Sequence, residues 1–155
     1  VADDLLSKIR YFAKSCDVDF VILDHLHMAL SSLGDGSNNE RQLIDYFVSK
    51  LRALVEETGI GLILVSHLSR AKDGNKGYED GLPVTMNSLR GSASIAQLSN
   101  MVISLSRDLQ SDTSLAQVNI LKNRFSGETG KACTLQYNLD TGCLTEVKAE
   151  VLDDF

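Results

Sequence analysis

The 155-residue sequence lacks the features that mark secreted and membrane proteins. Its three cysteines, Cys16, Cys133 and Cys143, form no CxxC pair and no even framework, so we expect reduced thiols packed as small apolar groups. No apolar run approaches the roughly 20 residues that span a bilayer, and no signal peptide opens the chain. These absences predict a cytoplasmic protein without a membrane span.

An initial methionine is also missing, so we expect a fragment, a processed chain or a trimmed sequence. With one proline, 43% hydrophobic residues and 23% charged residues, the composition is typical of a folded α/β domain rather than a disordered tail. The net charge of −6 argues against a protein that coats nucleic acid with its whole surface. Local basic loops are compatible with this charge.

The spacing of apolar residues predicts alternating helices and strands. Helical spacing over residues 2–16 predicts a first helix, and the apolar run Phe20–Leu23 is typical of a strand buried on both faces of a parallel sheet. Ser37 and Glu40 form a capping box before an apolar stripe that ends at Gly59. The later predicted elements are a strand at 62–65, a helix at 92–100, strands at 101–105 and 118–123, and an alternating strand at 133–139.

This order predicts an α/β fold with a mainly parallel sheet and an antiparallel carboxyl-terminal hairpin, which turns at residues 140–142. Two polar stretches, residues 31–39 and 69–86, are predicted loops. A loop as long as the second is usually functional or mobile in a compact domain.

The strand that ends in Asp24 has the form of a Walker B element. A carboxylate at the carboxyl end of a buried strand projects into the crevice where α/β sheets bind ligands. There it can hold the water shell of a Mg²⁺ ion that bridges nucleotide phosphates. Many sheet strands end in Asp, so this feature alone does not distinguish a nucleotide site from an ordinary strand end.

The matching Walker A loop is absent from the 155 residues. The segment Gly127-Glu128-Thr129-Gly130-Lys131-Ala132 has its glycines three apart rather than five. It precedes an alternating strand and not a helix, so no helix amino terminus would face a phosphate. We interpret this segment as a hairpin turn, and we expect that the chain by itself does not hydrolyse ATP.

A set of motifs follows Asp24 in a fixed order, and the combination is more specific than any one motif. They are Leu64-Val65-Ser66-His67-Leu68-Ser69-Arg70, Leu89-Arg90-Gly91-Ser92, Ile95-Ala96-Gln97-Leu98-Ser99 and Ile120-Leu121-Lys122-Asn123-Arg124-Phe125. From about Leu5 to Val147 this order resembles the hexameric replicative helicases of the DnaB type, which have a RecA-like core. It looks closest to the helicase half of phage primase–helicases, with Twinkle-like mitochondrial helicases more distant.

The resemblance implies a ring, expected to be a hexamer, that hydrolyses ATP or dTTP with Mg²⁺ at its subunit interfaces. Such a ring unwinds duplex DNA in the 5′-to-3′ direction. Residues 1–147 would then be a partial RecA-like motor domain without the Walker A strand, loop and helix, and residues 148–155 an acidic tail.

The resemblance also implies roles for residues of the nucleotide site. His67, at the end of the predicted strand beside that of Asp24, would sense a γ-phosphate by hydrogen bonding. Gln97 would lie near the nucleotide and the DNA. Lys122 and Arg124 alternate along one predicted strand and so share a face; they would reach the neighbouring subunit's ATP, with Arg124 as an arginine finger.

Two other histidines, His25 and His27, closely follow Asp24, and we interpret them as loop or partly buried residues. The acidic residue that activates water in this family normally lies upstream, and no residue of this sequence is assigned to it.

Two loops are expected to bind single-stranded DNA. Glycine and serine residues allow close approach to a phosphodiester backbone, and basic loops inside a ring bind a strand electrostatically even when the outer surface is acidic. Where phage relatives carry further basic residues, Ser69 and Ala96 stand here, so we expect the contacts to be redistributed. The expected DNA-binding residues are Arg70, Lys72, Lys76, Arg90, Gly91 and Ser92.

The acidic tail ends in Phe155. Its composition is equally compatible with a solubilising extension, but phage primase–helicases use a similar tail to contact their DNA polymerase. A DNA polymerase is therefore an expected partner.

Two other functions are compatible with the sequence. One is a RecA- or KaiC-like ATPase of recombination or regulation, although the Lys122 and Arg124 pair favours a helicase. The other is a non-catalytic oligomerisation or DNA-binding module, and a Walker A motif upstream in the parent gene would count against it.

Overall fold

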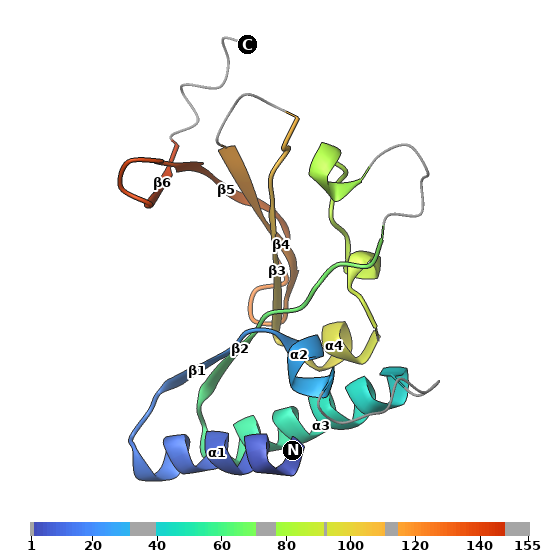
Figure 1. The fold of residues 1–155 in the computed structure, drawn as a ribbon, viewed down its shortest axis with the longest axis vertical. Coiled ribbons are helices and arrows are strands. Elements are labelled where there is room, and N and C mark those ends of the chain that lie inside the picture. The colour runs from blue at the N-terminus through green and yellow to red at the C-terminus, as the bar shows by residue number, and fades with distance from the viewer. Residues whose placement is uncertain (1, 32–39, 71–76, 92, 111–114, 148–155) are drawn as a thin grey trace. The chain divides into compact units, whose positions relative to one another are not determined.

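The structure is a computed structural model that describes residues 2–31, 40–70, 77–91, 93–110 and 115–147. The chain divides into two compact units, shown in Figure 1. The first unit comprises residues 1–69 and 89–98, and the second comprises residues 70–88 and 99–155. No helix within the described ranges has the length and apolar character needed to cross a membrane.

The first unit is a parallel pair of strands packed on helices. Strand β1 (Phe20–Leu23) pairs in parallel with β2 (Gly61–Leu64), with Val21 opposite Leu62. In Figure 1 the two longest helices run side by side near these strands. The helices are α1 (Ala2–Ser15), α2 (Leu26–Ser31), α3 (Glu40–Thr58) and α4 (Ala93–Leu98).

The core of this unit forms because α1 and α3 each carry an apolar stripe at helical spacing. Ile9 of α1 and Ile44, Phe47 and Leu51 of α3 are buried in one cluster. The α3 helix ends at Gly59, whose φ of 76° is a left-handed conformation that glycine adopts without strain, and Gly59 N donates to Val55 O at 2.9 Å. The prediction of both helices and of this stop is confirmed.

The prediction that Phe20–Leu23 is buried on both faces is wrong for the described part of the chain. Val21 and Leu23 pack against the core, whereas Phe20 is 69% exposed and Ile22 is 67% exposed. The reason is alternation. Successive side chains of a strand point to opposite faces, and within this unit the helices cover only one face of the pair.

The second unit is an antiparallel sheet with the order β3-β4-β5-β6. It also contains two short 3₁₀ helices, Tyr78–Asp80 and Met86–Ser88, inside or just after the predicted long loop. The strands are β3 (Met101–Ser106), β4 (Leu115–Asn123), β5 (Gly130–Tyr137) and β6 (Leu144–Glu146).

Parallel and antiparallel pairing are both present, as predicted, but in different proportions. Only β1 and β2 pair in parallel within the described ranges, and β3 joins the antiparallel sheet through β4 instead of extending a mainly parallel sheet. The apolar pattern of β3 identifies a strand but does not encode its partner, because pairing direction depends on how the connections run in space.

Three smaller predictions also meet the structure. Residues 127–130 lie between antiparallel β4 and β5, so the hairpin interpretation of the false phosphate loop is confirmed. The start of the predicted loop at 31–39 is wrong, because Ser31 ends α2; residues 32–39, with Ser37 of the capping box, lie outside the described residues. The cysteines are free thiols as expected, but Cys16 and Cys143 are exposed rather than packed.

Candidate functional site

Asp24 stands immediately after β1, at the carboxyl end of the parallel pair. The chain on both sides of it is tied to the segment that follows β2, since Val65 N donates to Leu23 O and Leu26 N donates to Val65 O, both at 3.0 Å. The peptide between Asp24 and His25 is cis. These bonds hold the exposed carboxylate at the strand end, which is where the sequence predicted it.

The surroundings of Asp24 fit a magnesium ion held mainly by water and phosphate. The described residues contain no group of three or more His, Cys, Asp or Glu side chains that could form a metal cage. Mg²⁺ usually keeps several waters and takes one or two carboxylates together with phosphate oxygens. A single exposed carboxylate is therefore a sufficient donor set from this chain.

Three histidine rings gather next to Asp24. His67, three residues beyond β2, makes an edge-on contact with His25 at 4.1 Å between ring centroids and lies 5.9 Å from the ring of His27. The sequence interpretation of His25 and His27 missed this cluster. The signal was available, because neighbouring parallel strands end at the same edge of a sheet, and these three residues follow two such strands.

His25 has a defined structural task. Its Nδ1 accepts a hydrogen bond from Met28 N at 3.3 Å, and its carbonyl accepts from the same nitrogen at 3.1 Å. The ring thus satisfies a backbone donor in the first turn of α2, as an amino-terminal cap does.

His27 is in a different situation. Both of its ring nitrogens are buried, and neither has a hydrogen-bond partner among the residues described. Burial lowers the pKa of His27 below its ordinary value of 6.5, and the nearby charge of Arg90 lowers this pKa further. The ring is therefore neutral at physiological pH.

The turn at Arg90 and Gly91 is fixed to the segment that carries His67. Arg90 N donates to His67 O at 2.9 Å, and Leu68 forms an antiparallel bridge with Leu89. Gly91 has a φ of 104°, and a Cβ at this position would overlap the Cδ1 atom of Ile44. Glycine is therefore required here for two reasons, backbone conformation and space.

The Arg90 side chain lies at the surface, 3.4 Å from the carboxylate of Glu40, and both side chains are more than half exposed. Exposed pairs of this kind contribute little to stability, so Arg90 can exchange this partner for a phosphate at small cost. Gln97 lies exposed on α4 of the same unit. Ser92 lies outside the described residues.

Lys122 and Arg124 belong to the second unit. Lys122 is near the end of β4, opposite Val102, and Arg124 lies one residue beyond the strand. The predicted alternation of the pair along one strand is therefore wrong, because a turn replaces the strand after Asn123. The two side chains still act on each other: burial first, and then the charge of Arg124, lowers the pKa of Lys122.

The turn that carries Arg124 is well ordered by hydrogen bonds. Arg124 N donates to Asn100 O at 2.9 Å, and the side-chain oxygen of Asn123 accepts from Phe125 N at 2.9 Å. Gly127 N closes the turn onto Asn123 O at 3.0 Å. An exposed guanidinium on such a turn is held close to the surface of its unit and can be presented to another molecule.

The remaining predicted residues are placed only in part. Arg70, which opens the second unit, is exposed. The predicted DNA-binding residues Lys72 and Lys76 and the predicted partner-binding residue Phe155 lie outside the described residues.

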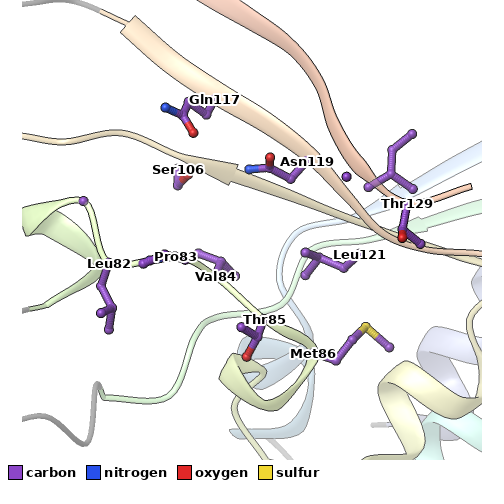
Figure 2. Close-up of a pocket in the computed structure, with 13 residues that line it drawn as sticks. Leu82, Pro83, Val84, Thr85, Met86, Ser106, Gln117, Asn119, Leu121 and Thr129 are labelled. Atoms are coloured by element: carbon purple, nitrogen blue, oxygen red, sulfur yellow. The ribbon is translucent and has the colours of Figure 1, made fainter.

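A cleft of about 450 Å³ lies in the second unit, between the segment 81–86 and the strands β3 and β4. Figure 2 shows Gln117 and Asn119 on the strand side and Pro83 and Val84 on the opposite wall. None of the lining residues is charged, and none is a predicted site residue. The cleft therefore lacks the cations that a phosphate group requires.

Comparison with known proteins gives consistent matches. The sequence model of the DnaB-like helicase C-terminal domain family matches residues 1–144. The chain is 38% identical over 144 residues to the DNA helicase/primase of Enterobacteria phage T3, which covers 92% of this chain and 25% of that protein. It is 28% identical over 120 residues to a probable plasmid replicative DNA helicase of Chlamydia trachomatis, covering 77% of this chain and 25% of that protein.

Among solved structures, a helicase ATPase domain matches with a TM-score of 0.70 at 21% sequence identity, over 95% of this chain and 51% of that chain. This likeness confirms the RecA-like fold class. The chain spans about a quarter of the length of these curated relatives and about half of the matched structure.

Proposed function

Because the chain belongs to the DnaB-like helicase C-terminal domain family, we propose that it is part of the motor of a replicative DNA helicase. The complete protein would form a ring, expected to be a hexamer, that hydrolyses ATP or dTTP between subunits and unwinds duplex DNA in the 5′-to-3′ direction. Residues 1–147 would be the partial motor domain, and the protein would act in the cytoplasm of a bacterium or an infected host.

The observation that carries this proposal is the cluster at the carboxyl end of β1 and β2. An exposed carboxylate on Asp24 and the edge-on histidines His25 and His67 follow the only two parallel strands of the described residues. This is the edge where α/β sheets bind ligands. We propose that Asp24 holds Mg²⁺ through water and that His67 donates a hydrogen bond to a γ-phosphate.

The magnesium ion would neutralise the charge of the nucleotide phosphates. The chain's own residues would position and sense. Gln97, exposed on α4 of the same unit as His67, would report on nucleotide and DNA. Lys122 and Arg124 would extend from the second unit toward the nucleotide held by a neighbouring subunit.

An arginine finger suits the geometry of Arg124. The guanidinium is planar and permanently charged, and it can donate two parallel hydrogen bonds to phosphate oxygens. Its backbone is fixed by the bond from Arg124 N to Asn100 O, so its side chain can be offered to a neighbour. Fingers of this type contribute about 10³ to 10⁵ in hydrolysis rate.

The test mixes two inactive full-length proteins. Arg124→Ala should assemble and bind nucleotide but hydrolyse it about 10³-fold more slowly or worse, and Asp24→Asn should lose hydrolysis through the metal. In mixed rings some interfaces pair an intact Asp24 with an intact Arg124, so part of the hydrolysis should return. Lys131→Ala, which removes an exposed cation from the same unit, is the matched control and should hydrolyse normally.

Mixed rings can be verified by pulling down one tagged variant with the other. If they form and the mixture is as inactive as either parent, Arg124 does not act on a neighbour. If the unsubstituted full-length protein neither hydrolyses nucleotide nor unwinds a forked duplex, the proposed function itself is refuted.

We further propose two partners. Single-stranded DNA would bind in the ring channel, and the acidic tail that ends in Phe155 would contact a basic patch on a DNA polymerase. The proposed DNA-binding residues are those of the two loops, Arg70, Lys72, Lys76, Arg90, Gly91 and Ser92.

A further inference from the structure

The three histidines near Asp24 differ in what their ring nitrogens do. His25 uses Nδ1 to accept a bond from Met28 N at 3.3 Å. His27, two residues later, has both ring nitrogens buried and unpaired within the described ranges. Buried polar groups are almost always hydrogen-bonded, and an exception in a native protein calls for an explanation. Rules of this kind are broken mainly at functional sites.

The ring of His27 lies between two segments that both carry proposed functional residues. On one side is His67, with 5.9 Å between the ring centroids. On the other is Gly91, where the site of an added Cβ would be 3.7 Å from His27 Nε2. Because Gly91 has only hydrogen there, the ring nitrogen can approach the backbone of the turn more closely than beside any other residue.

The two segments are also joined directly to each other. Arg90 N donates to His67 O at 2.9 Å, next to the bridge between Leu68 and Leu89. A shift of the turn at Arg90 and Gly91 must therefore be felt at His67, through this bond and through the ring of His27 that fills the angle between them.

The charges above the ring can rearrange. Arg90 and Glu40 both act electrostatically on His27, and they pair with each other at 3.4 Å at the surface. A DNA phosphate would draw Arg90 away from Glu40 at little cost, since the pair is exposed. The neutral ring of His27 offers one N–H donor and one acceptor, and either can bond to a backbone group of a turn that has moved.

We propose that His27 is a positioning residue that couples the turn at Arg90 and Gly91 to His67. This inference rests on the proposed function, in which the turn contacts DNA and His67 senses the nucleotide. In the DNA-free arrangement the ring nitrogens of His27 have no partner among the described residues. When DNA moves the turn, Nε2 of His27 gains a backbone partner at Gly91, and the ring shifts against His67.

The test uses the full-length protein and measures nucleotide hydrolysis with and without single-stranded DNA, together with the KM for nucleotide. His27→Phe keeps a flat ring and removes both nitrogens. Since neither nitrogen is paired within the described part of the chain, the variant should fold as well as the unsubstituted protein. We expect stimulation by DNA to fall about fivefold or more, the lower end of usual coupling between sites, while KM changes less.

Two conservative variants separate coupling from packing. His27→Gln places an amide near the position of Nε2 and should restore stimulation, whereas His27→Asn reaches only the position of Nδ1 and should not. Met28→Ala is the matched control, because Met28 lies on the same short helix and is 65% exposed; it should leave both rates unchanged.

Full DNA stimulation in a folded His27→Phe protein would overturn the inference. So would an equal loss in the Gln and Asn variants, which would point to packing alone and decides the matter even where the Phe variant folds poorly. If the unsubstituted protein hydrolyses nucleotide without any response to DNA, the proposed function fails first, and the inference fails with it.

Discussion

Replacing Gly91 by alanine should destabilise the first unit through two separable effects. The φ of 104° is a conformation that L-residues rarely adopt, and left-handed backbone costs a non-glycine residue about 1–2 kcal/mol. The new Cβ would also overlap Cδ1 of Ile44, a residue with no exposed surface, and overpacking of a core costs about 1–3 kcal/mol. Together we expect a loss of about 2–5 kcal/mol in the free energy of unfolding.

The second effect can be removed by trimming one atom. Ile44→Val deletes Cδ1 and leaves Cγ1, which would be 3.7 Å from the new Cβ, an ordinary contact. Alone, this change costs about 0.5–1.5 kcal/mol. In the double variant the overlap is absent, so the two losses should add up to about 1–3 kcal/mol less than their sum.

Urea unfolding of the four proteins, followed by circular dichroism, measures this coupling. Gly127→Ala is the matched control, because Gly127 has a φ of 78° and no atom within 4 Å of an added Cβ, so it isolates the backbone cost of about 1–2 kcal/mol. If the Gly91 and Ile44 losses add within about 0.5 kcal/mol, as independent sites do, the steric account of Gly91 is refuted.

Three further outcomes are expected. The pKa of Glu57 is lowered to about 2 by hydrogen bonds from Arg10 and then Lys14, so the stability that Glu57 contributes is present above its ordinary pKa of 4.5 and is lost as pH falls toward 2. The melting-temperature difference between the native chain and Glu57→Gln should therefore shrink on acidification, and a constant difference would contradict this linkage. In the complete ring, alanine substitution of the basic loop should reduce the salt slope of single-strand binding by roughly 0.7 for each phosphate that is no longer bound, and an unchanged slope would remove this loop from the channel; the substituted residues are Arg70, Lys72 and Lys76. Phe155→Ala should weaken polymerase binding in a pull-down without changing the melting temperature, and equal binding would leave the tail as a solubilising extension.

Local patterns were sufficient for the elements and for the ends of some of them. The stripe over α3 and the stop at Gly59 could be predicted because helical periodicity and the left-handed conformation of glycine are properties of a short stretch of chain. Asp24 could be placed for the same reason, since a carboxylate after an apolar run stands at a strand end whatever the rest of the fold does. The motif order from Asp24 to Arg124 also pointed correctly to the helicase family.

Other features depended on which segments meet. The pairing of β3 with β4 and the one-sided burial of Phe20 and Ile22 follow from the arrangement of neighbours, on which a strand's own residues carry no information. The same holds for the histidines. His25 and His27 lie about 40 residues from His67 in the chain, and nothing near them in the sequence distinguished them from ordinary loop residues. The parallel pairing of β1 with β2 brings all three to one edge.

The residue order was therefore enough to predict the elements and the residue types at their ends, because those depend on local periodicity and conformation. Which of these ends share a site was set by the three-dimensional arrangement, because long-range packing fixes the distances between them.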